Sequence, residues 1–113
     1  MSKREVWELI ERELFPLLPT WAEGVALGIG IGYHSVAPVK RTKDGTFFYS
    51  KSWAAVREPL KSDEEMRGLA RRLRELGVVK KIVATKDGKL YAVKRVREKY
   101  PFCFLEVEEV EGE

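Results

Sequence analysis

The chain has 113 residues but only one cysteine, one histidine, and no asparagine or glutamine at all. The single cysteine, Cys103, excludes an intrachain disulfide and any site built from several thiolates. The single histidine, His34, argues against a histidine-based zinc site. The sequence therefore predicts neither a structural disulfide nor a bound metal or cofactor.

Long apolar runs are also missing. No stretch reaches the roughly 18 apolar residues of a membrane span, and the N-terminal segment 2–5 is too polar for a secretion signal. We therefore expect a cytoplasmic protein without a membrane partner. The lack of amides, combined with 35% charged residues, is the pattern of thermophile proteins. The length predicts one domain over residues 1–113.

Charge is unevenly distributed, although the net charge is only +3. Residues 67–99 contain 12 Lys and Arg against three acidic residues, whereas residues 106–113 contain five Glu and no base. The sequence thus predicts a basic block followed by an acidic C-terminal tail. Such a layout indicates an anionic partner, or an acidic segment that competes for the same site.

Two segments have helical periodicity. Apolar residues recur at helical intervals over residues 3–15, where Pro16 ends the pattern. A second helix is predicted over residues 63–76, with Gly77 placed to cap its C-terminus. Trp7 on the first helix either packs on a sheet or makes a dimer contact, and packing is favoured.

The remaining segments favour strands. In residues 24–33, glycines at 28, 30 and 32 alternate with isoleucines. This alternation favours a strand whose glycine face lets another segment approach closely; the alternative is a glycine-containing helix packed tightly against another element. Strands are also predicted over residues 46–57, 78–85, 89–96 and 102–110, and Asp44-Gly45 and Asp87-Gly88 predict hairpin turns. The predicted fold class is α+β: an antiparallel sheet of four to five strands with two main helices, roughly αββαββ(β).

The register of the second hairpin depends on its turn. A two-residue turn at Asp87-Gly88 would place Lys80 opposite Arg95 and Lys81 opposite Lys94. Like charges directly opposed destabilise a sheet unless something neutralises them. A three-residue loop would shift this register.

The strand over residues 46–57 carries the main functional signal. A period of two places Phe47, Tyr49, Lys51, Trp53 and Arg57 on one side. Aromatic rings alternating with cations form the kind of surface on which bases stack while cations hold phosphates. The same pattern also fits a core strand whose rings face the helices, with solvated cations around it.

Enzymatic signals are weak. His34 and Ser35 are adjacent, so a strand would point their side chains in opposite directions, and no third partner is evident. Cys103 lies between Phe102 and Phe104, and such apolar neighbours are typical of a buried, unreactive thiol. We therefore expect no enzyme and no small-molecule substrate.

Three resemblances bear on function. Residues 62–96, with Leu69-Ala70-Arg71-Arg72-Leu73-Arg74 followed by a hairpin, resemble the recognition helix and wing of winged-helix DNA-binding domains. The αββαββ order resembles LAGLIDADG homing endonucleases, with Ile31 where that family has its metal-binding Asp, which implies duplex-DNA binding without catalysis. The size, the helix on an antiparallel sheet and the aromatic–basic face are similar to thermophilic archaeal single-stranded DNA-binding proteins of the ThermoDBP type.

The sequence thus predicts a non-enzymatic protein that binds single-stranded nucleic acid, with DNA favoured over RNA. The lack of Asn and Gln removes the usual bidentate readers of adenine, so little sequence preference is expected. The alternatives are a protein-interaction or self-associating module, and a duplex-DNA-binding domain; a homodimer is expected in either case. The predicted binding residues are Phe47, Tyr49, Lys51, Trp53, Arg57, Arg67, Arg71, Arg74, Lys80, Lys81, Tyr91, Lys94, Arg95 and Arg97.

Overall fold

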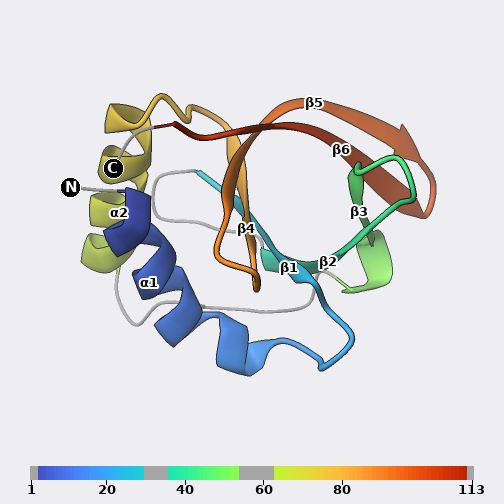
Figure 1. Cartoon of the computed structure of the whole chain (residues 1–113), viewed down its shortest axis with the longest axis horizontal. Helices are drawn as coiled ribbons and strands as arrows, with labels where there is room; N and C mark the ends of the chain where they lie inside the picture. The colour runs from blue at the N-terminus through green and yellow to red at the C-terminus, as the bar shows by residue number, and fades with distance from the viewer. Residues whose placement is uncertain (1–2, 30–35, 54–62, 112–113) are drawn as a thin grey trace.

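The computed structural model describes residues 3–29, 36–53 and 63–111 (Figure 1). Its elements, in chain order, are α1 (Lys3–Glu13), the 3-10 helix η1 (Phe15–Leu17), β1 (Gly24–Gly28), β2 (Val36–Arg41), β3 (Phe47–Ser50), the 3-10 helix η2 (Lys51–Trp53), α2 (Asp63–Glu75), β4 (Lys81–Thr85), β5 (Leu90–Lys99) and β6 (Phe102–Glu109). Neither α1 nor α2 is long and apolar enough to cross a lipid bilayer.

The strands form a closed antiparallel barrel in the order β1-β2-β3-β6-β5-β4. The predicted open sheet of four to five strands in an αββαββ(β) arrangement is therefore wrong. The barrel closes because β1 pairs with both β2 and β4, while β3 pairs with the last strand, β6. This closure also differs from the open αββαββ arrangement that the LAGLIDADG resemblance implied.

The interior of the barrel is filled by side chains from all six strands. The buried members of this cluster are Ala26, Val39, Phe47, Val83, Val93 and Leu105, one from each strand. Because side chains alternate between the two faces of a strand, their immediate neighbours point outward. The alternation therefore divides the barrel into a packed interior and an outer wall.

The helices cover only part of that outer wall. Val25, Ile82 and Leu90 on β1, β4 and β5 pack in one cluster with residues of both helices, including Ile10 and Leu73. Figure 1 shows α1 and α2 together beside this part of the barrel, with β3 on the far side. Within the described residues, neither α1 nor α2 thus lies over the outer faces of β3 and β6.

Trp7 shows how α1 is attached. Its indole Nε1 donates a hydrogen bond to the Thr85 carbonyl oxygen at 2.8 Å, and its ring meets Phe15 edge-on at 5.7 Å. The ring is partly buried against the helix-covered cluster. Packing on the sheet, rather than a dimer contact, therefore accounts for this residue.

Both predicted turns are three-residue loops with the same local chemistry. In the first turn, the Thr42 hydroxyl donates to the Asp44 carboxylate and accepts from the Thr46 backbone N–H. In the second turn, the Thr85 hydroxyl donates to Asp87 and accepts from the Lys89 backbone N–H. Gly45 and Gly88 follow, with φ of 89° and 95°, which favours glycine. The longer loop pairs Ile82 with Ala92, so the like-charged pairs of the two-residue register do not form.

Residues 24–28 form the predicted strand, but the close approach is at Gly24. A Cβ there would lie 2.4 Å from the Ala84 carbonyl oxygen, because β4 packs directly on it. At Gly28, no atom lies within 4 Å of that position. Gly30, Gly32 and Tyr33 lie outside the described residues.

The strand predicted over residues 46–57 is shorter in the structure. It ends at Ser50, whose hydroxyl lies 2.9 Å from that of Ser52, and the chain turns into η2. Residues 54–57, including Arg57, lie outside the described part of the chain. The two predicted helices occupy their expected places, although α1 ends two residues earlier than predicted and is followed by η1.

Candidate nucleic-acid interface

Three of the predicted aromatic binding residues face the barrel interior. Phe47 is 1% exposed and lies in the interior cluster, with the Tyr91 ring 5.3 Å away. Tyr49 also packs against that cluster. Their rings support the barrel and do not offer a free face for a base, so we do not retain them as stacking residues.

Tyr49 and Lys81 meet near one end of this interior. The Lys81 ammonium donates to the Tyr49 hydroxyl at 3.1 Å. Burial, together with a hydrogen bond to Cys103, raises the pKa of Tyr49 to about 12. Burial lowers the pKa of Lys81. Lys81 therefore binds a neutral phenol inside the protein, where it is not placed to hold a phosphate on the surface.

The predicted cations of α2 lie apart from the aromatic strand. Leu69 and Leu73 are buried on the inner face of α2. The side chains of Arg67, Arg71 and Arg74 on the same helix are exposed. Because α2 covers the wall opposite β3, these arginines do not share a surface with β3 (Figure 1). Lys80, just before β4, is likewise exposed.

Cations of β5, and Lys89 just before it, are partly neutralised by β6. Lys94 pairs with Glu108 at 3.2 Å and Lys89 pairs with Glu109 at 3.8 Å. Arg95 lies opposite Glu106 in the sheet register. The acidic residues up to Glu109 thus belong to a barrel strand beside the basic block, where they compensate part of its charge.

A different group of aromatic residues lies together on the outside of the barrel. It consists of Trp21, Phe48, Trp53, Phe102 and Phe104, which we call the aromatic surface. The rings form a continuous chain: Trp21 lies 4.7 Å from Trp53, Trp53 lies 6.0 Å from Phe48, and Phe48 lies 5.8 Å from Phe104. Trp21 and Phe102 remain 42% and 37% exposed.

Strand alternation explains why these rings gather. Phe48 on β3 lies directly opposite Phe104 on β6, and opposed residues share one face of a sheet. Since Phe47 points into the barrel, its neighbour Phe48 must point out. The aromatic surface therefore occupies a part of the wall that α1 and α2 do not cover.

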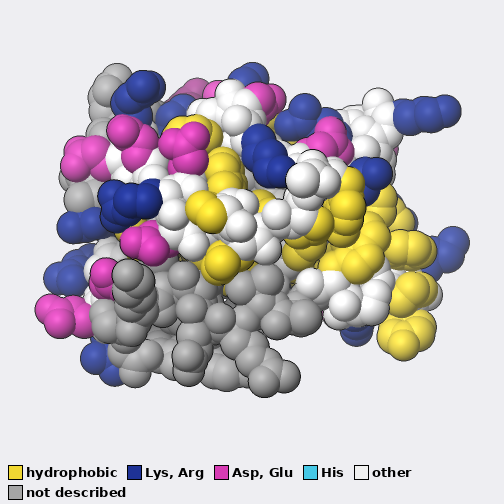
Figure 2. Space-filling view, turned by 90° about the horizontal axis from the view of Figure 1, so that it is seen from below, with side chains coloured by type: hydrophobic (Ala, Val, Ile, Leu, Met, Phe, Trp, Pro, Cys, Tyr) yellow, Lys and Arg dark blue, Asp and Glu magenta, His cyan; other side chains and the backbone are white. Residues whose placement is uncertain are grey.

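Cations lie directly over this surface. The Arg97 guanidinium lies 4.8 Å from the centre of the Phe104 ring, and the Lys40 ammonium lies 6.0 Å from the Trp21 ring. Lys51 follows β3 and pairs with Glu98 at 3.1 Å, which raises the pKa of Lys51. Figure 2 shows hydrophobic side chains gathered at one side of the molecule with Lys and Arg around them.

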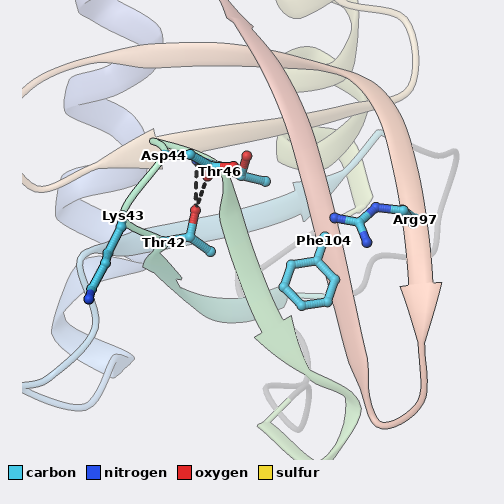
Figure 3. A pocket seen from close by; sticks show the side chains of 6 residues that line it. All are labelled: Thr42, Lys43, Asp44, Thr46, Arg97 and Phe104. Atoms are coloured by element: carbon cyan, nitrogen blue, oxygen red, sulfur yellow. Dashed lines mark hydrogen bonds between the residues drawn. The ribbon is translucent and has the colours of Figure 1, made fainter.

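A pocket of about 350 Å³ adjoins one end of the aromatic surface. It is lined by the first hairpin turn and by the two outer-face residues Arg97 and Phe104; its lining residues are Thr42, Lys43, Asp44, Thr46, Arg97 and Phe104 (Figure 3). Asp44 and Arg97 both line it, yet within the described residues no ion pair joins them.

The structure thus brings together only part of the predicted set. Trp53 belongs to the aromatic surface and Arg97 lies over it, whereas Lys51 contacts Glu98 and the Tyr100 ring instead. Sequence reasoning did not assign binding roles to Trp21, Lys40, Phe48, Phe102 or Phe104. The signal for Phe102 and Phe104 was their period-two spacing on a predicted strand, whereas Trp21 joins the surface through a loop and had no such signal.

No family model, curated protein or solved structure matches this chain. Among residues 3–29, 36–53 and 63–111, no three His, Cys, Asp or Glu side chains lie close enough together to hold a metal ion. What the site can do must therefore be argued from its rings, its cations and its pocket.

Proposed function

We propose that this protein is a non-enzymatic binder of single-stranded nucleic acid, preferentially DNA, and that the strand lies along the aromatic surface. One observation carries the proposal: a connected chain of five rings lies on the barrel wall that α1 and α2 do not cover, with Lys40 and Arg97 over the Trp21 and Phe104 rings. Single-strand binders combine stacking rings with cations that follow the backbone in the same way.

The arrangement favours single strands over duplexes. Stacking on Trp21 or Phe102 requires an exposed base face, which a paired and stacked duplex does not offer. The duplex alternative also depended on an open sheet, and the barrel has none. Stacking is tolerant of sequence because every base has a flat face, so most positions are expected to show little preference.

The alternative is that the same surface docks on another protein or on a second copy of this chain. Exposed aromatic residues are common at such interfaces. The cations over the rings favour a polyanion, because a phosphate backbone needs charge next to the stacking platform. Salt dependence separates the two proposals, since nucleic-acid affinity falls steeply with salt whereas apolar docking does not.

The test is fluorescence anisotropy with a labelled thymidine oligonucleotide, in a salt series and against a duplex competitor. We expect binding that weakens with salt and is not displaced by duplex. Trp21→Ala should weaken it by about 5- to 150-fold, the loss of one stacked base. Val79→Ala is the control, because Val79 is 68% exposed and lies outside the aromatic surface. No binding at low salt, or an equal effect of both variants, would refute the proposal.

A further inference from the structure

The pocket beside Phe104 differs chemically from the rest of the aromatic surface. The rings can stack on any base, but the pocket adds a carboxylate from Asp44 and a guanidinium from Arg97, which line it from separate elements (Figure 3). Its volume, about 350 Å³, lies within the usual range for small-molecule sites. Opposite charges in one pocket without a mutual ion pair leave both groups able to bind a ligand.

Asp44 is held in place by its turn. The Thr42 hydroxyl and the Thr46 backbone N–H both donate to its Oδ1 atom. These bonds, the one from Thr42 foremost, lower the pKa of Asp44, so the side chain is a carboxylate at neutral pH. A carboxylate has about four acceptor positions, so it keeps capacity for N–H donors from a ligand.

Arg97 is oriented by Phe104. Its guanidinium lies 4.8 Å from the ring centre, and no carboxylate in the described part of the chain pairs with it. A guanidinium held over a ring still directs its N–H groups outward in a planar fork, which suits bidentate acceptors. The pocket thus presents an acceptor held by its turn and a two-pronged donor that lies over a ring.

We infer that this pocket is a subsite for one guanine base of a bound single strand. Guanine is the one common base with two adjacent acceptors and two adjacent donors: O6 and N7 accept from an arginine fork, and N1–H and N2–H₂ donate to a carboxylate, whereas adenine and cytosine offer a carboxylate only one amino group. The negative charge of Asp44 would repel a phosphate. Thymine has a single N–H donor, so it could make only one hydrogen bond to the Asp44 carboxylate. The inference rests on the proposed function, and it adds preference at one position to otherwise tolerant binding.

The second hairpin supplies a matched control. Asp87 accepts from Thr85 in a turn of the same design, but that turn does not line the pocket that contains Arg97 and Phe104. Asp44→Asn and Asp87→Asn therefore make the same chemical change in the same kind of loop. Only the first alters the pocket.

The experiment compares three labelled oligonucleotides of about 12 nucleotides, within the site sizes of single-strand binders. One is all thymidine, one has a single central guanine, and one has hypoxanthine there, which lacks the N2 amino group. We expect the guanine oligonucleotide to bind about tenfold more tightly than all-thymidine, with hypoxanthine between them. Asp44→Asn should abolish the gain and leave thymidine affinity within about twofold, while Asp87→Asn keeps the gain.

The outcomes separate the two proposals. Equal affinity for the thymidine and guanine oligonucleotides, or a guanine preference that survives in Asp44→Asn, overturns the guanine subsite while the proposed function stands. Failure of every oligonucleotide to bind refutes both. A loss of thymidine affinity in Asp44→Asn as large as the loss of guanine affinity also overturns the subsite, because Asp44 would then act on the whole surface.

Discussion

Phe47 and Phe48 are adjacent in sequence but lie on opposite faces of β3, so alanine at each should have contrasting effects. Phe47 is 1% exposed inside the barrel, and removing a buried phenylalanine side chain destabilises a protein by about 3–5 kcal/mol. Phe48 lies outside and touches Trp53, Phe102 and Phe104; at about 0.5–1.5 kcal/mol per ring pair, loss of the three contacts should lower stability by about 1.5–4.5 kcal/mol, and we expect the low end because Phe48 is only partly buried.

The effects on binding should be reversed. Phe48→Ala breaks the centre of the aromatic surface, so affinity for a thymidine oligonucleotide should fall by about 5- to 150-fold. Phe47→Ala should bind normally at temperatures where it is folded. Urea denaturation followed by circular dichroism gives the stabilities, and anisotropy gives the affinities.

Domain stability is commonly about 5–15 kcal/mol, so a loss of about 3–5 kcal/mol brings a domain at the low end of that range close to unfolding. Phe47→Leu, which keeps more of the side-chain volume, then provides the same comparison with a smaller loss. If Phe48→Ala proves the more destabilising variant, or if Phe47→Leu weakens binding as much as Phe48→Ala does, the assignment of inside and outside on β3 is incorrect.

Two further predictions concern the barrel itself. Gly24→Ala should lower the free energy of unfolding markedly, because its Cβ would lie 2.4 Å from the Ala84 carbonyl oxygen, whereas Gly28→Ala meets no atom within 4 Å; similar urea midpoints for the two variants would contradict this contact. Tyr49 should ionise near pH 12 rather than its usual 10.0. Since its folded pKa is raised, the stability it contributes is complete below pH 10 and is lost as pH rises toward 12. Tyrosinate absorbance with Tyr49→Phe as reference checks this, and a difference signal centred near pH 10 would disprove it.

Local structure was largely predictable from the sequence. Helical periodicity located α1 and α2, and the two Asp-Gly pairs located both hairpin turns. These features depend on residues close together in the chain, where spacing and backbone preference act directly. A three-residue loop was an open alternative for the second hairpin only, and the hydroxyls of Thr42 and Thr85 explain why both turns take this form.

Barrel closure was not predictable in the same way. It depends on β3 pairing with β6, strands separated by about half the chain, and period-two patterns do not specify which strands pair. Without the strand pairing, the sequence also could not show which face of β3 points into the barrel. Phe47, Phe48 and Tyr49 are three consecutive aromatic residues, so both faces of the strand carry rings. The pattern alone therefore could not determine which ring faces the core.

The same reasoning applies to the candidate site. Trp53 was identified because it lies on an aromatic stretch, but its partner Trp21 is 32 positions earlier and meets it only through the fold. Likewise, Arg97 and Asp44 line one pocket because β5, β6 and the first turn are neighbours in the barrel. Surfaces assembled from distant segments require the three-dimensional structure.

The most direct test of the central claim is to locate where a single strand contacts the protein. An iodouracil-substituted oligonucleotide can be photo-crosslinked to the folded protein and the attached residues identified by mass spectrometry. The account predicts crosslinks at Trp21, Trp53 and Phe48 on the aromatic surface. Crosslinks confined to α2, around Arg67 and Arg71, would contradict it.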